Sequence, residues 1–347
     1  MTINDILRGQ IQPNKSFRRQ SVLVQSAAGI TMVMFVIGFI NGICSFITFR
    51  NKELRKVGCV LYLLASSITS LLTITMFTVK FWFVVFIQLH SIISSSILQT
   101  DCAFIGPVLK LCLYLDGWLN ACVAIERTVN VSKGITFDKK MSKRAARWII
   151  PILFLIIMGT IIHEPISHEL FEYPTQKYKP INNNLAMNKS MRNEIYSEYE
   201  IEHNVLCVIR YSRSVQTYNT ITLFVHLVVP FLLNLCSALF IIFGTARQRS
   251  TTHNNQTLRE HILKQINEHK QLLISPIILL IMALPRLIIS LVSGCVDPSN
   301  NPWLYLCGYF TSFIPPMLIF AVFVLPSELY WKTFKDSITK WRRHGCW

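Results

Sequence analysis

Several charged side chains lie within apolar stretches of this sequence, where they could do chemistry. Lys110, Asp116 and Arg127 fall along one predicted helix, and Arg286 lies in another. A charge inside a membrane-spanning helix is costly, so such residues usually face a partner, a cavity or water. The guanidinium of Arg286 can bind a carboxylate through two parallel hydrogen bonds. These residues are therefore candidates for ligand binding or for internal ion pairs, and not for contact with lipid.

Each candidate also has a purely structural interpretation. Asp116 either takes part in function or accepts hydrogen bonds that hold the core together. Lys110 either faces a cavity or extends its amine towards the membrane surface. His226, in a later apolar stretch, either lines the same cavity or is a packing residue with its hydrogen bonds satisfied. The expected structural partners of the aspartate are Ser67, Ser70 and Asn41.

The composition indicates a membrane protein. Hydrophobic residues make up 52% of the 347 residues and charged residues only 15%, against about 25% in an ordinary soluble domain. Apolar runs long enough to cross a bilayer recur along the chain. We predict an all-α membrane protein, a bundle of seven transmembrane helices followed by a short amphipathic cytoplasmic helix. The predicted spans are residues 22–49, 57–85, 99–127, 145–163, 218–245, 270–293 and 303–326.

The basic residues lie in alternate loops, and this pattern predicts the orientation. The formal net charge is +16, and the bases concentrate in residues 50–56, 133–147, 247–264 and 332–343. Cytoplasmic loops of membrane proteins carry such an excess of Lys and Arg. We therefore predict a plasma-membrane protein with an extracellular N-terminus and a cytoplasmic C-terminus. The charge is explained in this way without a nucleic-acid partner.

Residues 1–341 are predicted to form one transmembrane domain, with 342–347 as a cytoplasmic tail. Residues 1–20 are polar and lack the apolar core of a signal peptide, so the first helix is expected to direct insertion. The sequons at Asn14 and Asn188 fall on the outer side and are predicted glycosylation sites. Residues 327–341 have the amphipathic pattern of a helix that lies on lipid. Cys346, after a basic stretch, is a candidate for palmitoylation.

The third predicted span carries a thiol at one end and an acid–arginine pair at the other. At about 1.5 Å per residue, the distance from Cys102 to Arg127 spans the hydrocarbon core of a bilayer. This stretch, which ends in Glu126-Arg127-Thr128, resembles the third helix of rhodopsin-like (family A) G-protein-coupled receptors. The resemblance covers nearly the whole chain. The other positions that match the family are Asn41, Cys207, Pro230, Pro285 and Pro326.

The resemblance implies a disulfide bond between Cys102 and Cys207, which lies in the long outer loop before the fifth span. Both thiols are predicted on the oxidising side of the membrane. Cys295 and Cys307 flank the last outer loop and are candidates for a second, weaker bridge.

The resemblance also implies roles in activation. Arg127 would pair with Glu126 at rest and would be released to meet a heterotrimeric G protein when the sixth span moves. Pro285 and Pro326 would take part through helix kinks. Tyr330 would belong to a degenerate Asn-Pro-x-x-Tyr motif in which the tyrosine is displaced by one position.

Several positions depart from the family pattern. Ile68 replaces the aspartate that binds sodium in the family, and Asp116 could compensate in part. Leu109 stands where amine receptors carry an aspartate, so an amine ligand is not expected. The last span contains no lysine, so a retinal cofactor is not expected either. Asn41 would bond the second and seventh helices by the resemblance, and a simple packing role is the alternative.

These observations predict a cell-surface receptor whose ligand binds between the outer halves of the bundle. Lys110, His226 and Arg286 are the predicted ligand-binding residues. A peptide ligand is favoured because the outer loop before the fifth span is long and charged. A small-molecule chemosensory receptor of the same fold is the alternative, and a transporter or channel is a further one. The sequence contains no nucleophile–base set and no metal-ligand spacing, so neither an enzyme, a metal nor a cofactor is expected.

Overall fold

The structure is a computed structural model of the chain. It describes residues 21–89, 101–178, 199–209, 211–250 and 302–344, together with a few residues between 277 and 288. Within these ranges the side chains of both strands, and of some residues near segment ends, are not described.

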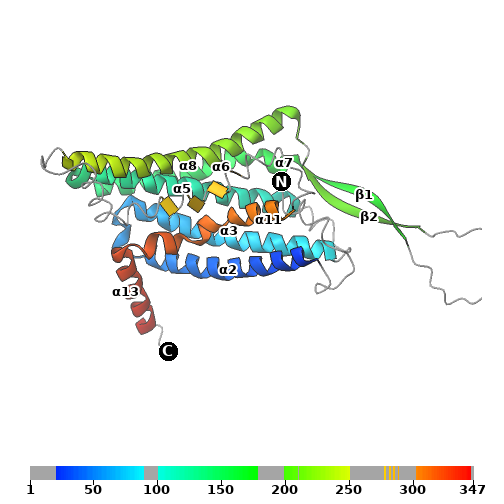
Figure 1. The fold of residues 1–347 in the computed structure, drawn as a ribbon, viewed down its shortest axis with the longest axis horizontal. Helices are drawn as coiled ribbons and strands as arrows, with labels where there is room; N and C mark the ends of the chain where they lie inside the picture. The colour runs from blue at the N-terminus through cyan, green and yellow to red at the C-terminus, as the bar shows by residue number, and fades with distance from the viewer. Residues whose placement is uncertain are drawn as a thin grey trace, which may run out of the picture.

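Five long apolar helices run side by side along the longest axis of the molecule (Figure 1). Each contains a segment long and apolar enough to cross a membrane, and a helix satisfies its own backbone hydrogen bonds in lipid. They correspond to the first five predicted spans, so the prediction of membrane-length apolar helices is confirmed for these. The five helices are α2 (Val22–Phe49), α3 (Gly58–Leu89), α5 (Gly106–Lys133), α6 (Lys139–Ile161) and α8 (Arg213–Ser250).

Local sequence signals explain several of the helix ends. α5 follows a π-helical turn, η3 (Asp101–Ile105), and has Pro107 in its first turn, where a proline costs no hydrogen bond. It ends at Gly134, whose φ of 51° is a left-handed conformation that glycine adopts readily. α6 begins after Asp138, whose carboxylate accepts hydrogen bonds from the backbone of Lys140 and Met141 at 2.8 and 3.2 Å.

The connections bring two of the predicted basic segments, 50–56 and 133–147, together at one end of the bundle. The turns η2 (Leu54–Lys56) and η4 (Gly134–Thr136) lie at the end where α8 finishes and the last helix, α13 (Glu328–His344), begins (Figure 1). We call this the basic end. Its described bases in the two turns and the adjoining helix are Arg50, Lys52, Arg55, Lys56, Lys133, Lys139, Lys140, Lys143 and Arg144.

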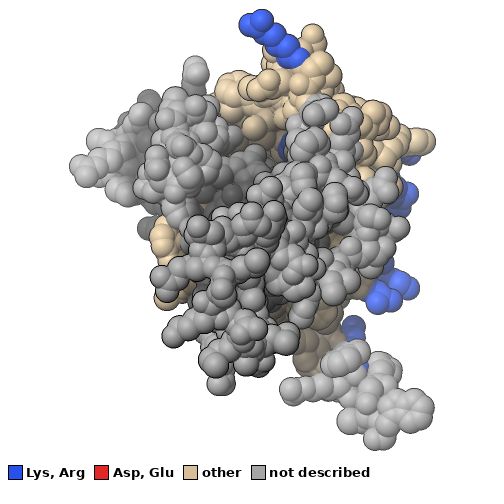
Figure 2. Space-filling model, turned by 90° about the vertical axis from the view of Figure 1, so that its right-hand side faces the viewer, with Lys and Arg blue, Asp and Glu red and all other residues tan. Residues whose placement is uncertain are grey.

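A β-hairpin projects from the opposite end, which we call the hairpin end (Figure 1). A short helix, α7 (His163–Ser167), leads into β1 (His168–Tyr178), which pairs antiparallel with β2 (Tyr199–Ile209). The sequence prediction was all-helical and did not include this hairpin. Its register places Cys207 opposite Leu170. Seen from this end, the described surface shows no acidic side chain, and Lys and Arg appear only at its margins (Figure 2).

The last predicted span, 303–326, is not one continuous helix. It is divided into α11 (Pro302–Thr311), α12 (Ile314–Met317) and a π-helical turn, η5 (Phe320–Val324). Pro315 and Pro316 explain the interruption, because each lacks an amide hydrogen and clashes with the preceding turn. The Ser70 hydroxyl of α3 donates a hydrogen bond to the Pro316 carbonyl, so the break is partly compensated by a neighbouring helix. The sixth predicted span, 270–293, lies mostly outside the described residues, so seven spans remain a prediction.

α13 leaves the basic end next to α2 and extends away from the bundle, roughly at right angles to the long helices (Figure 1). The turn at Pro326 separates it from η5. Its apolar side meets the bundle, with Phe334 buried and stacked on Trp331 at a centroid distance of 5.6 Å. Lys335 Nζ lies over the Trp331 ring, 5.1 Å from its centroid. The predicted amphipathic helix at 327–341 is therefore present, and it extends to His344.

The helices pack closely where small residues allow it. Gly38 and Gly42 of α2 are buried against α3, and a Cβ added at Gly42 would lie 2.5 Å from a side-chain carbon of Leu71. Small residues at such an interface let two helix backbones approach in a membrane protein. Two apolar clusters fill the interior. One is centred on Phe77 and Phe313, and the other includes Phe323 and lies against α13.

Candidate functional site

α5 carries polar groups at three levels of the bundle. Lys110 lies near its hairpin end, Asp116 near its middle and Arg127 near its basic end. At about 1.5 Å per residue, Lys110 and Arg127 are about 25 Å apart along the helix axis. One rigid helix therefore connects a polar region at the hairpin end with another at the basic end.

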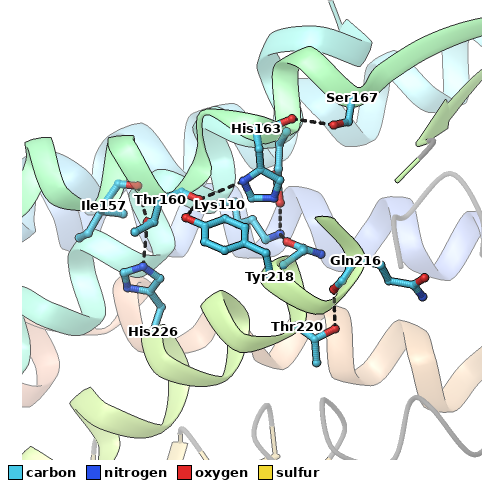
Figure 3. A network of polar contacts seen from close by, with 11 residues as sticks. Lys110, Ile157, Thr160, His163, Ser167, Gln216, Tyr218, Thr220 and His226 are labelled. Atoms are coloured by element: carbon cyan, nitrogen blue, oxygen red, sulfur yellow. Dashed lines mark hydrogen bonds and ion pairs between the residues drawn. The ribbon is translucent and has the colours of Figure 1, made fainter. Parts of the chain in front are cut away.

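At the hairpin end, Lys110 forms an ion pair that links three helices (Figure 3). Its Nζ contacts Glu164 Oε1 of α7 and lies 3.4 Å from Asn219 Oδ1 of α8. The side chain of Glu164 is 7% exposed and that of Lys110 is 27% exposed. Lys110 therefore neither points into open space nor extends to the membrane surface, because its amine is held between a buried carboxylate and an amide.

His226 is hydrogen-bonded at both ring nitrogens. Trp118 Nε1 donates to its Nδ1 at 2.9 Å, and its Nε2 lies 2.9 Å from Thr160 Oγ1. Indole nitrogen can only donate, so Nδ1 must accept. The Thr160 hydroxyl already donates to Ile157 O at 2.8 Å, so Nε2 carries the proton and donates to it. These partners select a neutral imidazole with its proton on Nε2, since an imidazolium would have no acceptor to offer Trp118.

Thr160 connects this histidine with a second aromatic pair (Figure 3). Its carbonyl accepts from His163 Nδ1 at 3.0 Å and from the Tyr218 hydroxyl at 3.2 Å. The rings of His163 and Tyr218 meet edge to face, with centroids 5.0 Å apart. Tyr114 stacks on His226 at 4.7 Å from the other side. Thr160 is therefore the residue at which contacts from α6, α7 and α8 meet, and His226 extends them to α5.

We call these connected side chains the hairpin-side network. They come from α5, α6, α7 and α8, and their hydrogen bonds are largely made within the protein. Two predicted ligand-binding residues, Lys110 and His226, lie in it. Any ligand that binds them must exchange its own polar groups for existing protein contacts. The members of the network are Lys110, Tyr114, Trp118, Thr160, His163, Glu164, Tyr218, Asn219 and His226.

Asp116 is buried, 3% exposed, in the middle of the bundle. It accepts a hydrogen bond from the Ser66 hydroxyl and another from Asn120 Nδ2 at 3.2 Å. The partners predicted from sequence donate elsewhere: Ser67 to Leu63 O, Ser70 to Pro316 O and Asn41 to Ile37 O. The aspartate thus has polar neighbours that satisfy it, and Ser66 and Asn120 are not among the partners expected from the sequence.

Near the basic end, Glu126 contacts α6 and not Arg127. The Ser142 hydroxyl donates to Glu126 Oε1, and the Gly58 amide donates to the same hydroxyl oxygen at 3.1 Å. A Cβ at Gly58 would lie 2.6 Å from the Ser142 carbonyl, so only glycine fits this contact. The expected Glu126–Arg127 ion pair is not formed among the described residues. This serine–carboxylate link, which ties α3, α5 and α6 together, takes its place.

Arg127 lies inside the bundle, only 8% exposed. Its guanidinium is 5.1 Å from the centroid of Phe323 in η5, and the Tyr330 hydroxyl and the Cys59 thiol lie beside it. Nη1 has no hydrogen-bond partner among the described residues. Burial raises the pKa of Tyr330, so its hydroxyl stays protonated. We call Cys59, Arg127, Phe323 and Tyr330 the basic-end cluster.

Several predicted site residues lie outside the described part of the chain. They include Arg286, Asn14, Asn188, Cys295 and Cys346. Pro285 falls in a helical stretch of which only a few residues are described, and Cys307 is a free, exposed thiol. The side chains of Cys102 and Cys207 are not described, but the backbone of β1, the partner strand of β2, contacts η3, which contains Cys102.

Sequence reasoning did not identify several residues that hold the two polar regions. Glu164, Trp118 and Thr160 belong to the hairpin-side network, and Phe323 holds Arg127. Glu164 offered one signal, because it is the first acid after the apolar fourth span. The others are of types that are usual in any apolar helix, so nothing in the sequence distinguished them.

No model of a known protein family matches this chain, and no curated protein sequence is significantly similar to it. The functional assignment therefore rests on the residues and their geometry.

Proposed function

We propose that this protein is a cell-surface receptor of the rhodopsin-like, seven-helix type that binds an extracellular ligand and activates a heterotrimeric G protein. In this proposal the hairpin end faces outwards and the basic end faces the cytosol. The gathering of bases at one end supports this orientation, because cytoplasmic segments carry the excess of Lys and Arg. The sixth and seventh spans are supplied by residues 270–293 and 303–326.

The observation that carries the proposal is the position of Arg127. An arginine buried at a membrane protein's basic end is costly, and here an aromatic ring, not a carboxylate, holds its guanidinium. Its Nη1, which has no hydrogen-bond partner among the described residues, gains from a conformation in which it reaches one. A G protein that supplies this partner would favour that conformation over the resting one.

The structure supports a different resting contact from the one that the resemblance implied. The guanidinium of Arg127 lies over the Phe323 ring and beside the Tyr330 hydroxyl. Activation would therefore release Arg127 from η5 and α13. The segment that would move is the interrupted last span, since Pro315, Pro316 and the π-helical turn break its regular helical hydrogen bonding. Glu126 would keep its link to Ser142.

The hairpin-side network would be the inner limit of the ligand site. A peptide is the favoured ligand class, because β1 and β2 form a two-stranded ribbon, and extended peptides bind by adding a strand to such an edge. A peptide carboxylate could then compete with Glu164 for Lys110.

A test that needs no known ligand uses Phe323→Leu. A cation–π contact contributes about 1 kcal/mol, so its loss should raise the population of the active conformation about fivefold. The readout is ligand-independent dissociation of G-protein subunits in cells, measured by energy transfer for each G-protein class. Arg127→Ala in the Phe323→Leu background should abolish the added signal.

The matched control is Arg144→Ala, which removes an exposed base at the same end. It should leave the Phe323→Leu signal unchanged. Surface expression of every variant is measured in parallel. If Phe323→Leu reaches the surface normally and no G-protein class responds, the proposed function is wrong.

A further inference from the structure

A groove at the basic end lies between the last turn of α2 and the side of α13. Its volume is about 280 Å³, and it is lined by Phe46, Ile47, Arg50, Asn51, Ser337 and Ile338. Three of these side chains are apolar. The other three can all donate hydrogen bonds. The groove is smaller than the roughly 300–1,000 Å³ pockets that enclose whole small ligands, so it suits one part of a larger amphiphile.

The groove lies where a membrane span ends. The apolar segment of α2 finishes at Phe49, and Arg50 follows directly. α13 projects outward from the end of the bundle at this level (Figure 1), as an amphipathic helix does at the boundary between headgroups and acyl chains. Ile40 and Ile43 are both exposed. They lie on the same face of α2 as Ile47, closer to the centre of the span. An apolar path therefore leads away from the groove along the outside of the bundle.

The charge around the groove is positive. Arg50 is exposed, and the described residues form no ion pair with it. Glu53, the one acid of residues 50–56, is already paired with Lys56 at 2.5 Å. This pairing lowers the pKa of Glu53, and Lys340 of α13 adds to the effect, so α13 also contributes a base here. The local excess of bases favours a negatively charged occupant.

We propose that this groove binds an anionic phospholipid from the membrane leaflet at the basic end. The Arg50 guanidinium binds the phosphate, with the Asn51 amide and the Ser337 hydroxyl as further donors. The glycerol region contacts Phe46 and Ile338, and one acyl chain follows the exposed face of α2. The lipid would join α13 to α2 on their outer side. This site is separate from both polar regions described above and does not depend on the proposed function.

The test compares lipid binding to the purified full chain by native mass spectrometry. Phosphatidylserine and phosphatidylcholine with identical acyl chains are titrated separately. Phosphatidylserine should bind more tightly. Arg50→Gln should weaken its binding about fivefold, the factor that corresponds to the ~1 kcal/mol of one base near an anionic headgroup. Ser337→Phe, which fills the groove, should weaken the binding of both lipids.

The matched control is Lys140→Gln, which removes an exposed base of α6 at the same end but outside the groove. It should leave phosphatidylserine binding within about twofold of the wild type. Equal loss in Arg50→Gln and Lys140→Gln would mean general attraction to a basic surface and would overturn the site. Equal affinity for the two lipids, or unchanged binding to Ser337→Phe, would overturn it as well.

Discussion

The contribution of the ion pair between Lys110 and Glu164 to the free energy of unfolding can be measured directly. Removing one partner of a buried pair costs about 3–5 kcal/mol, because the other charge stays behind. The two partners are not equally buried, with 27% of the Lys110 side chain exposed and 7% of that of Glu164. Water can therefore relieve an abandoned lysine better than an abandoned glutamate.

We expect Lys110→Met to cost about 3–5 kcal/mol and Glu164→Gln to cost less, about 1–3 kcal/mol. The double variant leaves neither charge in the interior. Its cost should be smaller than the sum of the two single costs by about 1–3 kcal/mol. This difference is the coupling energy of the pair and does not include contacts that each side chain makes independently.

The assay is thermal unfolding of the purified variants in one detergent, followed by tryptophan fluorescence. Lys139→Met, at an exposed position of α6, serves as the control for the loss of a lysine and should be near neutral. If the single costs add within about 0.5 kcal/mol in the double variant, the two residues are not energetically coupled. Lys110 would then be free to serve a ligand without breaking a structural contact.

Three further changes test the packing and the polar network. Gly42→Ala should destabilise the protein by about 1–3 kcal/mol through overpacking against α3, whereas Gly29→Ala, which has open space around its Cβ, should be neutral or slightly stabilising in the same thermal assay. Trp118→Phe removes the donor to His226 Nδ1 and should cost about 1–3 kcal/mol, while retained stability would show that the indole hydrogen bond adds nothing. Burial raises the pKa of Tyr211 to about 12, so the unfolded phenol ionises first and stability should fall as the pH rises from about 10 to 12; Tyr211→Phe should remove that part of the alkaline loss of thermal stability.

The spans were predictable where composition alone decides them. The first span was predicted at 22–49, and α2 has these bounds because a continuous apolar run ends abruptly at Arg50. The fourth span was predicted too short, at 145–163, because its first turns are basic. α6 begins at Lys139, where the capping carboxylate of Asp138 starts the helix before the apolar run does.

The sequence contains the signal for the interruption of the last span, but a count of apolar residues does not detect it. Pro315 and Pro316 are adjacent, and a proline inside a helix removes a hydrogen bond and displaces the preceding turn. Counting apolar residues treats them as neutral, so one span was predicted where three short helical pieces occur. The hairpin was missed for a different reason, because its strands pair across a long connection and neither strand has a clear alternation of apolar and polar residues.

The contacts of the charged residues could not be predicted from spacing. Glu126 and Arg127 are neighbours in sequence, but consecutive residues of a helix point in directions about 100° apart. Glu126 therefore meets Ser142 of α6 while Arg127 meets Phe323 of η5. The partner of Lys110 is likewise set by tertiary packing. Glu164 lies on α7, which is separated from α5 in the chain by the full length of α6.

In the proposed receptor, these placements determine which parts of the molecule would carry a signal between the two ends. α5 holds Lys110 and Arg127 on one continuous helix, and its interior contacts at Asp116 are satisfied, so it gains little by bending. The partners of Lys110 and Arg127 lie on short elements outside the long helices. Glu164 lies on the five-residue helix α7, and Phe323 lies in the π-helical turn that follows the proline break. In the proposed receptor, coupling between the ends would therefore act through displacement of α7 and η5 relative to α5.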